Sequence, residues 1–201
     1  MPTVPEAIPQ PDAILRYGNG AVFLHWLTAA LVVAQVIVGF TFSWLPRGPA
    51  QAEWFTWHKT LGATILLLAL VRLAWRLGHK PPPFPDTLSR FERVAATWTH
   101  RVFYALLILL PLTGLLTISG GADRATTGFV GGLRLPLVPG VSDDAGEAAE
   151  AAHVVLVFAT LALLVLHVAG ALKHQFFDAS RASGRMPPFR TRDGTPTTPV
   201  N

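Results

Sequence analysis

The chain has 201 residues, of which 51% are hydrophobic and only 14% are charged. Soluble domains carry about 25% charged residues, so this composition argues against an ordinary soluble enzyme. The formal net charge of +4 is modest, and we predict no nucleic-acid partner. The chain has no cysteine, which excludes disulfides, thiolate nucleophiles and iron–sulfur clusters ligated by cysteine.

The apolar residues gather into four long blocks, 21–45, 55–77, 95–118 and 151–177. Each block is long enough to cross a hydrocarbon core of about 30 Å as a helix. The blocks predict a transmembrane domain over 21–177, preceded by a polar, proline-rich segment over 1–20 that lacks the pattern of a signal peptide. The polar tail, 178–201, is expected to be disordered at its end.

Basic residues predict the orientation of these spans. Twelve of the 16 lysines and arginines lie in the two terminal segments, in the second connection or at the adjoining helix ends. The positive-inside rule therefore places both termini in the cytoplasm. The predicted fold is all-α, an integral membrane four-helix up-down bundle surrounded by lipid.

Six of the seven histidines lie in the apolar blocks or at their ends. A titratable side chain at this depth is costly and indicates function. His153 and His167 are 14 residues apart in the fourth block. Fourteen residues are two heptads, so both side chains point the same way in a left-handed bundle, about 21 Å apart along the axis. The fourth helix therefore carries one histidine near each membrane surface.

The same step of 14 residues recurs on the other three helices and sorts the polar residues into two levels. The outer level receives two histidines and two glycines, His58, His153, Gly39 and Gly114. The inner level receives three histidines and an arginine, His25, His100, His167 and Arg72. Glycine lets another group approach the backbone closely, so the outer level has room for something flat and bulky.

Paired histidines at two levels predict two non-covalent b-type haems, each held by two imidazoles from different helices. Zinc is a poorer match, because it requires four protein ligands or three with water. The sequence has no CxxCH motif for covalent attachment, and its two methionines lie outside the blocks. The haem carboxylates need basic partners, for which the candidates are Arg72 and Arg76 inside, and Lys59 with Arg47 or Arg134 outside. At the inner level this reasoning leaves the ligand pair open.

At these residues the chain resembles the bacterial cytochrome b561 family, which also includes hydrogenase-type b cytochromes. The resemblance covers residues 15–178. It is carried by four stretches: His25-Trp26-Leu27; His58-Lys-Thr-Leu-Gly62 with Val71-Arg72-Leu73-Ala74-Trp75-Arg76; His100-Arg-Val-Phe-Tyr104 with Pro111 and Gly114; and His153 with Leu166-His167-Val-Ala-Gly-Ala-Leu-Lys-His174-Gln-Phe-Phe177.

The resemblance implies a four-helix cytochrome with two haems that exchanges electrons with quinone. It implies His58 with His153 as the outer ligand pair and His25 with His167 as the inner pair. His100 is then expected beside the haem edge or a quinone site. His174, one heptad beyond His167, is interpreted as a surface histidine or a proton donor to quinone, and His79 as a solvated loop residue.

Three functions are compatible with these features. The first is electron transfer across the membrane to or from the quinone pool, with superoxide as a small-molecule donor and ubiquinone as the acceptor, as in small members similar to superoxide:ubiquinone oxidoreductases. The second is a cytochrome anchor that passes electrons between quinone and a periplasmic dehydrogenase or hydrogenase. The third is a small transporter without haem in which the histidines relay protons. The sequence leaves open whether the chain is an enzyme or an electron-transfer subunit.

Overall fold

The computed structural model describes residues 14–177, 182–189 and 196–200. Four helices dominate it, α1 (Asn19–Trp44), α2 (Pro49–Gly78), α3 (Arg90–Ser119) and α4 (Asp143–Phe176). All four are long and apolar enough to cross a membrane. The predicted all-α four-helix membrane bundle is therefore confirmed.

All four helices start earlier than the apolar blocks, α1 by only two residues and the other three by more than a turn, because their first turns lie in polar sequence. Pro49 occupies the first turn of α2. The Ser89 hydroxyl accepts a hydrogen bond from the Glu92 amide, and the Glu92 carboxylate accepts one from the Ser89 amide. The Ser142 side chain caps α4 by accepting from the Ala145 amide at 3.3 Å. Hydropathy thus located the apolar part of each helix, and the side-chain caps Ser89 and Ser142 mark the starts of α3 and α4.

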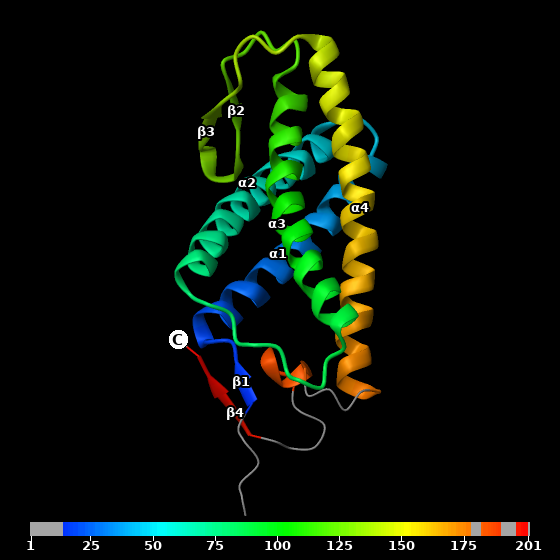
Figure 1. Cartoon of the computed structure of the whole chain (residues 1–201). Helices are drawn as coiled ribbons and strands as arrows, with labels where there is room; N and C mark the ends of the chain where they lie inside the picture. Colours follow the sequence, from blue (N-terminus) through cyan, green and yellow to red (C-terminus); the bar gives the residue numbers. More distant parts are fainter. Residues whose placement is uncertain (1–13, 178–181, 190–195, 201) are drawn as a thin grey trace, which may run out of the picture.

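The helices form two hairpins, α1 with α2 and α3 with α4, which are joined through contacts between α2 and α3. The two hairpins cross at a clear angle (Figure 1). The core between them is small and consists of Ile65, Ala69 and Leu107, with Leu31 and Val32 packed against it. Large apolar side chains instead cover the outside of all four helices, as expected for a protein surrounded by lipid: Phe23, Ile37, Leu67, Leu109 and Phe158 are examples.

The connection between α3 and α4 folds back along α2 (Figure 1). Strands β2 (Thr126–Gly128) and β3 (Arg134–Pro136) pair antiparallel around a short helix, η1 (Val130–Gly132). The Lys59 ammonium on α2 donates to the Thr127 hydroxyl at 2.8 Å. The Thr60 hydroxyl accepts from the Val130 amide at 3.0 Å. This connection is therefore fastened to α2 beside the outer histidine level.

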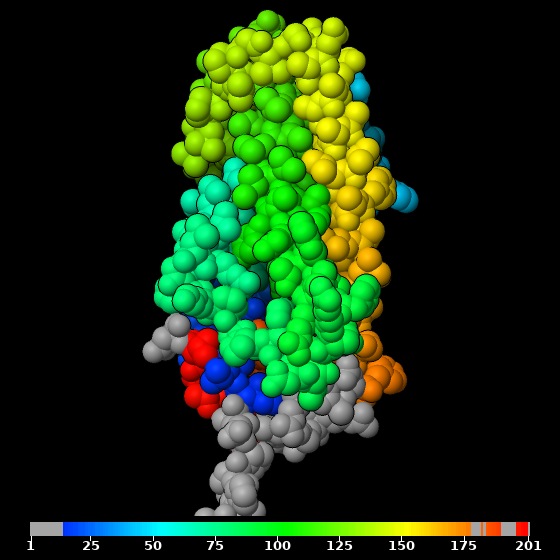
Figure 2. Space-filling model, in the orientation of Figure 1, coloured from blue at the N-terminus to red at the C-terminus, as the bar shows by residue number. Residues whose placement is uncertain are grey.

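Two short strands, one from each end of the described part of the chain, pair at the opposite end of the bundle. Strand β1 (Ile14–Arg16) pairs in parallel with β4 (Thr197–Pro199), and η2 (Ala182–Arg185) lies beside α4. The space-filling view shows β1 and β4 side by side at the base of the molecule (Figure 2). Backbone pairing with β1 holds β4, and this pairing leaves no periodic signal in the sequence. The disorder expected at the end of the tail stays a prediction, and residues 178–181, 190–195 and 201 lie outside the described ones.

Candidate functional site

The outer level brings together one histidine from each hairpin. His58 on α2 and His153 on α4 are half-buried, and their ring centroids are 6.3 Å apart. A bond from a metal ion to an imidazole nitrogen is about 2 Å long, and the ring centroid lies roughly 1 Å beyond that nitrogen. Two imidazoles that bind one metal ion from opposite sides therefore have ring centroids about 6 Å apart. The separation of the two rings therefore matches that of a pair of axial ligands.

Two groups on α3 hold the ring of His153. Its Nδ1 lies 2.9 Å from the carbonyl oxygen of Leu110 and 3.1 Å from the hydroxyl of Thr113. A carbonyl oxygen can only accept, so Nδ1 carries the proton and donates it to Leu110, which leaves Nε2 with a free lone pair. This is the tautomer that a metal-binding histidine requires. Sequence reasoning missed Thr113, whose only signal is its place beside Gly114.

A glutamine in the middle of α1 contacts the other outer histidine. The Gln35 side-chain amide donates to the His58 carbonyl oxygen at 3.1 Å, and its nitrogen lies 3.4 Å from Nε2 of the ring. The Nδ1 atom of His58 and the Oε1 atom of Gln35 are buried without hydrogen-bond partners among the described residues. A buried polar atom without a partner suggests a group that is not part of the chain. Sequence reasoning also missed Gln35, although a polar residue in the centre of a span is itself a signal.

The two glycines of the outer level each contact one of these imidazoles. A Cβ atom on Gly39 would lie 3.3 Å from Cε1 and Nδ1 of His58. A Cβ atom on Gly114 would lie 3.3 Å from Cε1 of His153. Both separations are tighter than ordinary carbon contacts of about 3.5–4.0 Å. The absence of a side chain at each glycine thus lets α1 and α3 approach the histidine rings.

The inner level gathers three histidines around His167. The His167 ring centroid is 6.3 Å from that of His25 on α1, and 5.6 Å from that of His100 on α3. The Phe103 ring also packs against His167, with centroids 5.4 Å apart. The His25–His167 separation equals that of the outer pair. The inner level therefore repeats the outer geometry and adds His100 at its side.

Arg72 lies at the inner level, as the 14-residue step from His58 predicts. Its Nη2 atom is 2.9 Å from Nδ1 of His25, and its guanidinium carbon is 5.8 Å from the ring centroid of Tyr104. A guanidinium group can only donate, so Nδ1 of His25 is the acceptor and Nε2 carries the ring proton, the opposite of the His153 tautomer. Metal binding by Nε2 of His25 therefore requires Arg72 to leave Nδ1. Arg72 thus contacts a histidine directly, while its half-buried side chain stays within reach of an anion at this level.

The remaining candidates lie around these two levels. His174 is half-buried near the end of α4. His79 is exposed and stacks on Trp75 with centroids 4.1 Å apart, which agrees with its interpretation as a solvated residue. Outside, Lys59 is bound to Thr127 as described above. Two further arginines of the outer side are exposed, Arg47 and Arg134.

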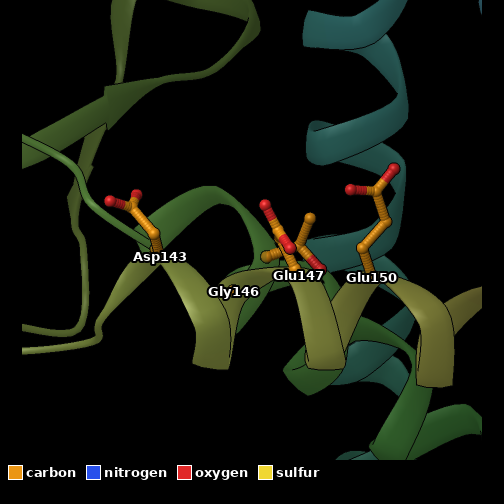
Figure 3. Close-up of a pocket in the computed structure, with 6 residues that line it drawn as sticks. Asp143, Gly146, Glu147 and Glu150 are labelled. Carbon is orange, nitrogen blue, oxygen red and sulfur yellow. The ribbon is translucent and has the colours of Figure 1, made fainter.

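A cavity of about 160 Å³ lies at the outer end between α3 and α4. Its lining residues are Thr117, Gly120, Asp143, Gly146, Glu147 and Glu150. The three carboxylates stand along the first turns of α4 (Figure 3). At its base the helices almost touch, since a Cβ on Gly120 would lie 2.7 Å from the Gly146 Cα. The first turns of α4 are therefore acidic, whereas α2 carries Lys59 on its outer part.

Metal binding by the chain alone is not supported. Across the described ranges, no group of three or more histidine, cysteine, aspartate or glutamate side chains is arranged to hold a metal ion. Two imidazoles per level are enough only for a metal that brings its other ligands with it, as the iron of a porphyrin does. The residues present therefore fit haem and do not fit a bare ion.

Comparison with known proteins gives an independent result. A family model described as prokaryotic cytochrome b561 matches residues 16–188. "Cytochrome b561 homolog 2" of Escherichia coli (strain K12) is 29% identical over 179 residues, which cover 85% of this chain and 90% of the relative. "Probable superoxide oxidase CybB" of Yersinia pestis is 27% identical over 177 residues, with 86% and 96% covered. The residues matched by the family model, 16–188, include both histidine levels.

Proposed function

Because the chain belongs to the prokaryotic cytochrome b561 family and is a membrane cytochrome, we propose that it binds two b-type haems and transfers electrons across the membrane to the quinone pool. The observation that carries this proposal is the equal separation of 6.3 Å within the pairs His58–His153 and His25–His167. Both pairs share α4, whose 14-residue step sets two levels about 21 Å apart.

The ligand pairs that we propose are His58 with His153 outside and His25 with His167 inside. Haem iron held by two imidazoles has no open position, so when bound it supplies reversible one-electron chemistry rather than oxygen activation. Leu110 and Thr113 keep His153 in the tautomer with a free Nε2. Gln35 positions His58 from α1.

At the inner level, Arg72 is the proposed partner for haem carboxylates. His100 lies beside His167, and we assign it to the edge of the inner haem or to a quinone site. His174 is the proposed proton donor to ubiquinone, since reduction of a quinone consumes protons from the inner side. Gly39 and Gly114 leave room at the outer level for the porphyrin. Lys59 and Arg134 are candidate partners for its carboxylates.

The proposed donor is superoxide, with ubiquinone as the acceptor. One relative is named a probable superoxide oxidase, and the basic side of the outer surface offers an anion a route to His58. Lys59 and Arg124 are close enough for their charges to act on each other. Two positive charges on one side would draw an anionic substrate away from the acidic cavity above α4.

A second candidate is an anchor subunit that takes electrons from a periplasmic dehydrogenase or hydrogenase. It is favoured by the β2–β3 connection, where Leu133 and Leu135 are exposed on the outer side, 59% and 38% accessible. Exposed apolar side chains on a folded connection suit a docking partner. Superoxide-dependent quinone reduction by the purified chain alone favours the first candidate, and co-purification of a stoichiometric dehydrogenase favours the second.

The central test is a reduced-minus-oxidised absorption spectrum of the detergent-purified protein, with a pyridine haemochrome assay for stoichiometry. We expect a low-spin b-type spectrum and two haems per chain. His153→Ala and His167→Ala should each remove one haem, whereas His79→Ala, which changes an exposed histidine, should remove none. A colourless wild-type protein, or two haems in all three variants, would refute the proposal and favour a histidine-relay transporter.

The proposed location is the bacterial inner membrane with both termini in the cytoplasm. The support is the concentration of basic residues at the end of the bundle where β1 and β4 pair. Fused after Asn201, a reporter that works only in the cytoplasm should be active and one that works only in the periplasm should be inactive. Inserted in the β2–β3 connection, the periplasmic reporter should be active and the cytoplasmic one inactive. The opposite pattern would reverse the orientation.

A further inference from the structure

Three arginines lie around Tyr17 at the inner end of the molecule. Arg76 on α2 donates from Nη1 to the Tyr17 hydroxyl at 3.3 Å. The guanidinium carbon of Arg185, in η2, lies 5.5 Å from the centroid of the same ring. Arg72 is one helical turn from Arg76 on α2 and contacts His25. Two arginines from a membrane helix and one from the C-terminal segment thus gather beside the inner histidines.

Arg185 is unusually buried for an arginine, with 8% of its surface exposed. Its guanidinium donates to the carbonyl oxygen of Pro82 and lies 4.6 Å above the ring of Phe84. Its Nε atom is buried without a hydrogen-bond partner among the described residues. Burial lowers the pKa of Arg185, because the charged form loses hydration. A buried cation with an unused donor is stable only with a compensating acceptor nearby.

The described part of the chain supplies no carboxylate to this cluster. Its ion pairs lie elsewhere, between Arg93 and Asp86 and between Lys173 and Glu92. Arg72 lies 2.9 Å from Nδ1 of His25, so the cluster adjoins the inner histidine level. Like charges held this close repel one another. An anion from outside the chain would relieve that repulsion.

We propose that Arg72, Arg76 and Arg185, with the hydroxyl of Tyr17, form an anion site for carboxylate or phosphate oxygens at the inner level. Guanidinium groups bind both anions through paired N–H donors. Two sources have this chemistry, the carboxylates of the inner haem and the phosphate of a lipid in the inner leaflet. The carboxylate source rests on the proposed function, whereas the phosphate source does not. In either case the C-terminal segment contributes Arg185 to the site.

The first arm of the test compares haem with haem dimethyl ester, in which both carboxylates are blocked. Holoprotein exchanged with either pigment is mixed with an excess of a haem-accepting apoprotein, and the rate of pigment loss is measured. Arg185→Gln should speed the loss of one haem by about tenfold, because a hydrogen bond to a charged group stabilises a complex by about that factor. The same variant should leave the rate of ester loss unchanged, because the ester has no free carboxylate. A purely structural role would alter both rates equally.

Two control variants keep the result interpretable. Arg90→Gln removes an exposed arginine at the start of α3 and should behave as wild type. Arg185→Lys keeps the positive charge and should retain part of the difference between haem and ester. Equal elution of all variants in size-exclusion chromatography, with equal helix content by circular dichroism, shows that they are folded.

The second arm detects phospholipid in the purified protein by native mass spectrometry. A phospholipid retained by wild type and Arg90→Gln but lost from Arg185→Gln would support the site with lipid phosphate as its ligand. Equal effects of Arg185→Gln on haem and ester, with no lipid lost, would overturn the anion site. If the wild-type protein holds no haem, the proposed function fails, and the lipid arm alone decides whether the anion site exists.

Discussion

Gly120→Ala should destabilise the protein by separating α3 from α4 at the outer end. The new Cβ atom would lie 2.7 Å from the Cα atom of Gly146 and 3.3 Å from the carbonyl oxygen of Ser142. Carbon atoms pack best at about 3.5–4.0 Å, so the helices must move apart by roughly 1 Å. Backbone cannot rotate away as a side chain can. We therefore expect a cost of about 1–3 kcal/mol, typical of an overpacked contact.

The measurement is thermal unfolding in detergent micelles, followed by circular dichroism at one scan rate for every variant. For a chain of this size each kcal/mol lowers Tm by about 2–4 °C, so Gly120→Ala should melt about 2–12 °C below wild type. Gly146→Ala should show a loss of the same order, because its Cβ would meet the Gly120 Cα at 2.7 Å. The matched control is Gly78→Ala at the end of α2, where a Cβ has open space. If Gly120→Ala melts at or above this control, the close approach of α3 and α4 is wrong.

Three further predictions concern the surroundings of the outer histidines. Thr113→Val removes one of the two acceptors of His153 Nδ1, while the hydrogen bond from Nδ1 to the Leu110 carbonyl oxygen remains. The outer haem should therefore be lost at most about tenfold faster in a haem-transfer assay. Gln35→Leu removes the donor that contacts His58, and should change the midpoint potential of only one haem in a redox titration; a shift of both would contradict a local role. Lys59→Gln removes a positive charge from the outer surface, so superoxide-dependent quinone reduction should slow and become less sensitive to ionic strength. An unchanged rate and salt dependence would exclude steering by this lysine.

The surrounding lipid explains how a small apolar core suffices. Among the described residues only Ile65, Ala69 and Leu107 form a buried cluster, while the outward faces present large apolar residues to lipid. In a bilayer the helices gain little from burying apolar surface against one another, so packing and polar contacts decide their arrangement. The contacts of Gln35 with His58 and of Thr113 with His153 are therefore part of both the fold and the site.

Much of this architecture follows from local sequence. An apolar run of sufficient length forms a helix in lipid because every backbone polar group must be satisfied within the segment. The four spans could therefore be predicted from hydropathy alone. The step of 14 residues from His153 to His167 fixes depth and helix face, because both follow from helical geometry within a single segment. The two levels, and the residues assigned to them, were predictable for that reason.

The tertiary structure decided what depends on the rotation and crossing of one helix relative to another. Periodicity places His25 and His100 at similar depth, but only packing sets their ring separations from His167 at 6.3 Å and 5.6 Å. Helix capping and chain-end pairing are likewise invisible to hydropathy. Arg185 reaches the inner level because η2 folds beneath the bundle and hydrogen-bonds its backbone carbonyl to the Tyr17 amide at 3.0 Å, a contact between residues far apart in the sequence. Such contacts have no local pattern, so only the folded chain reveals them.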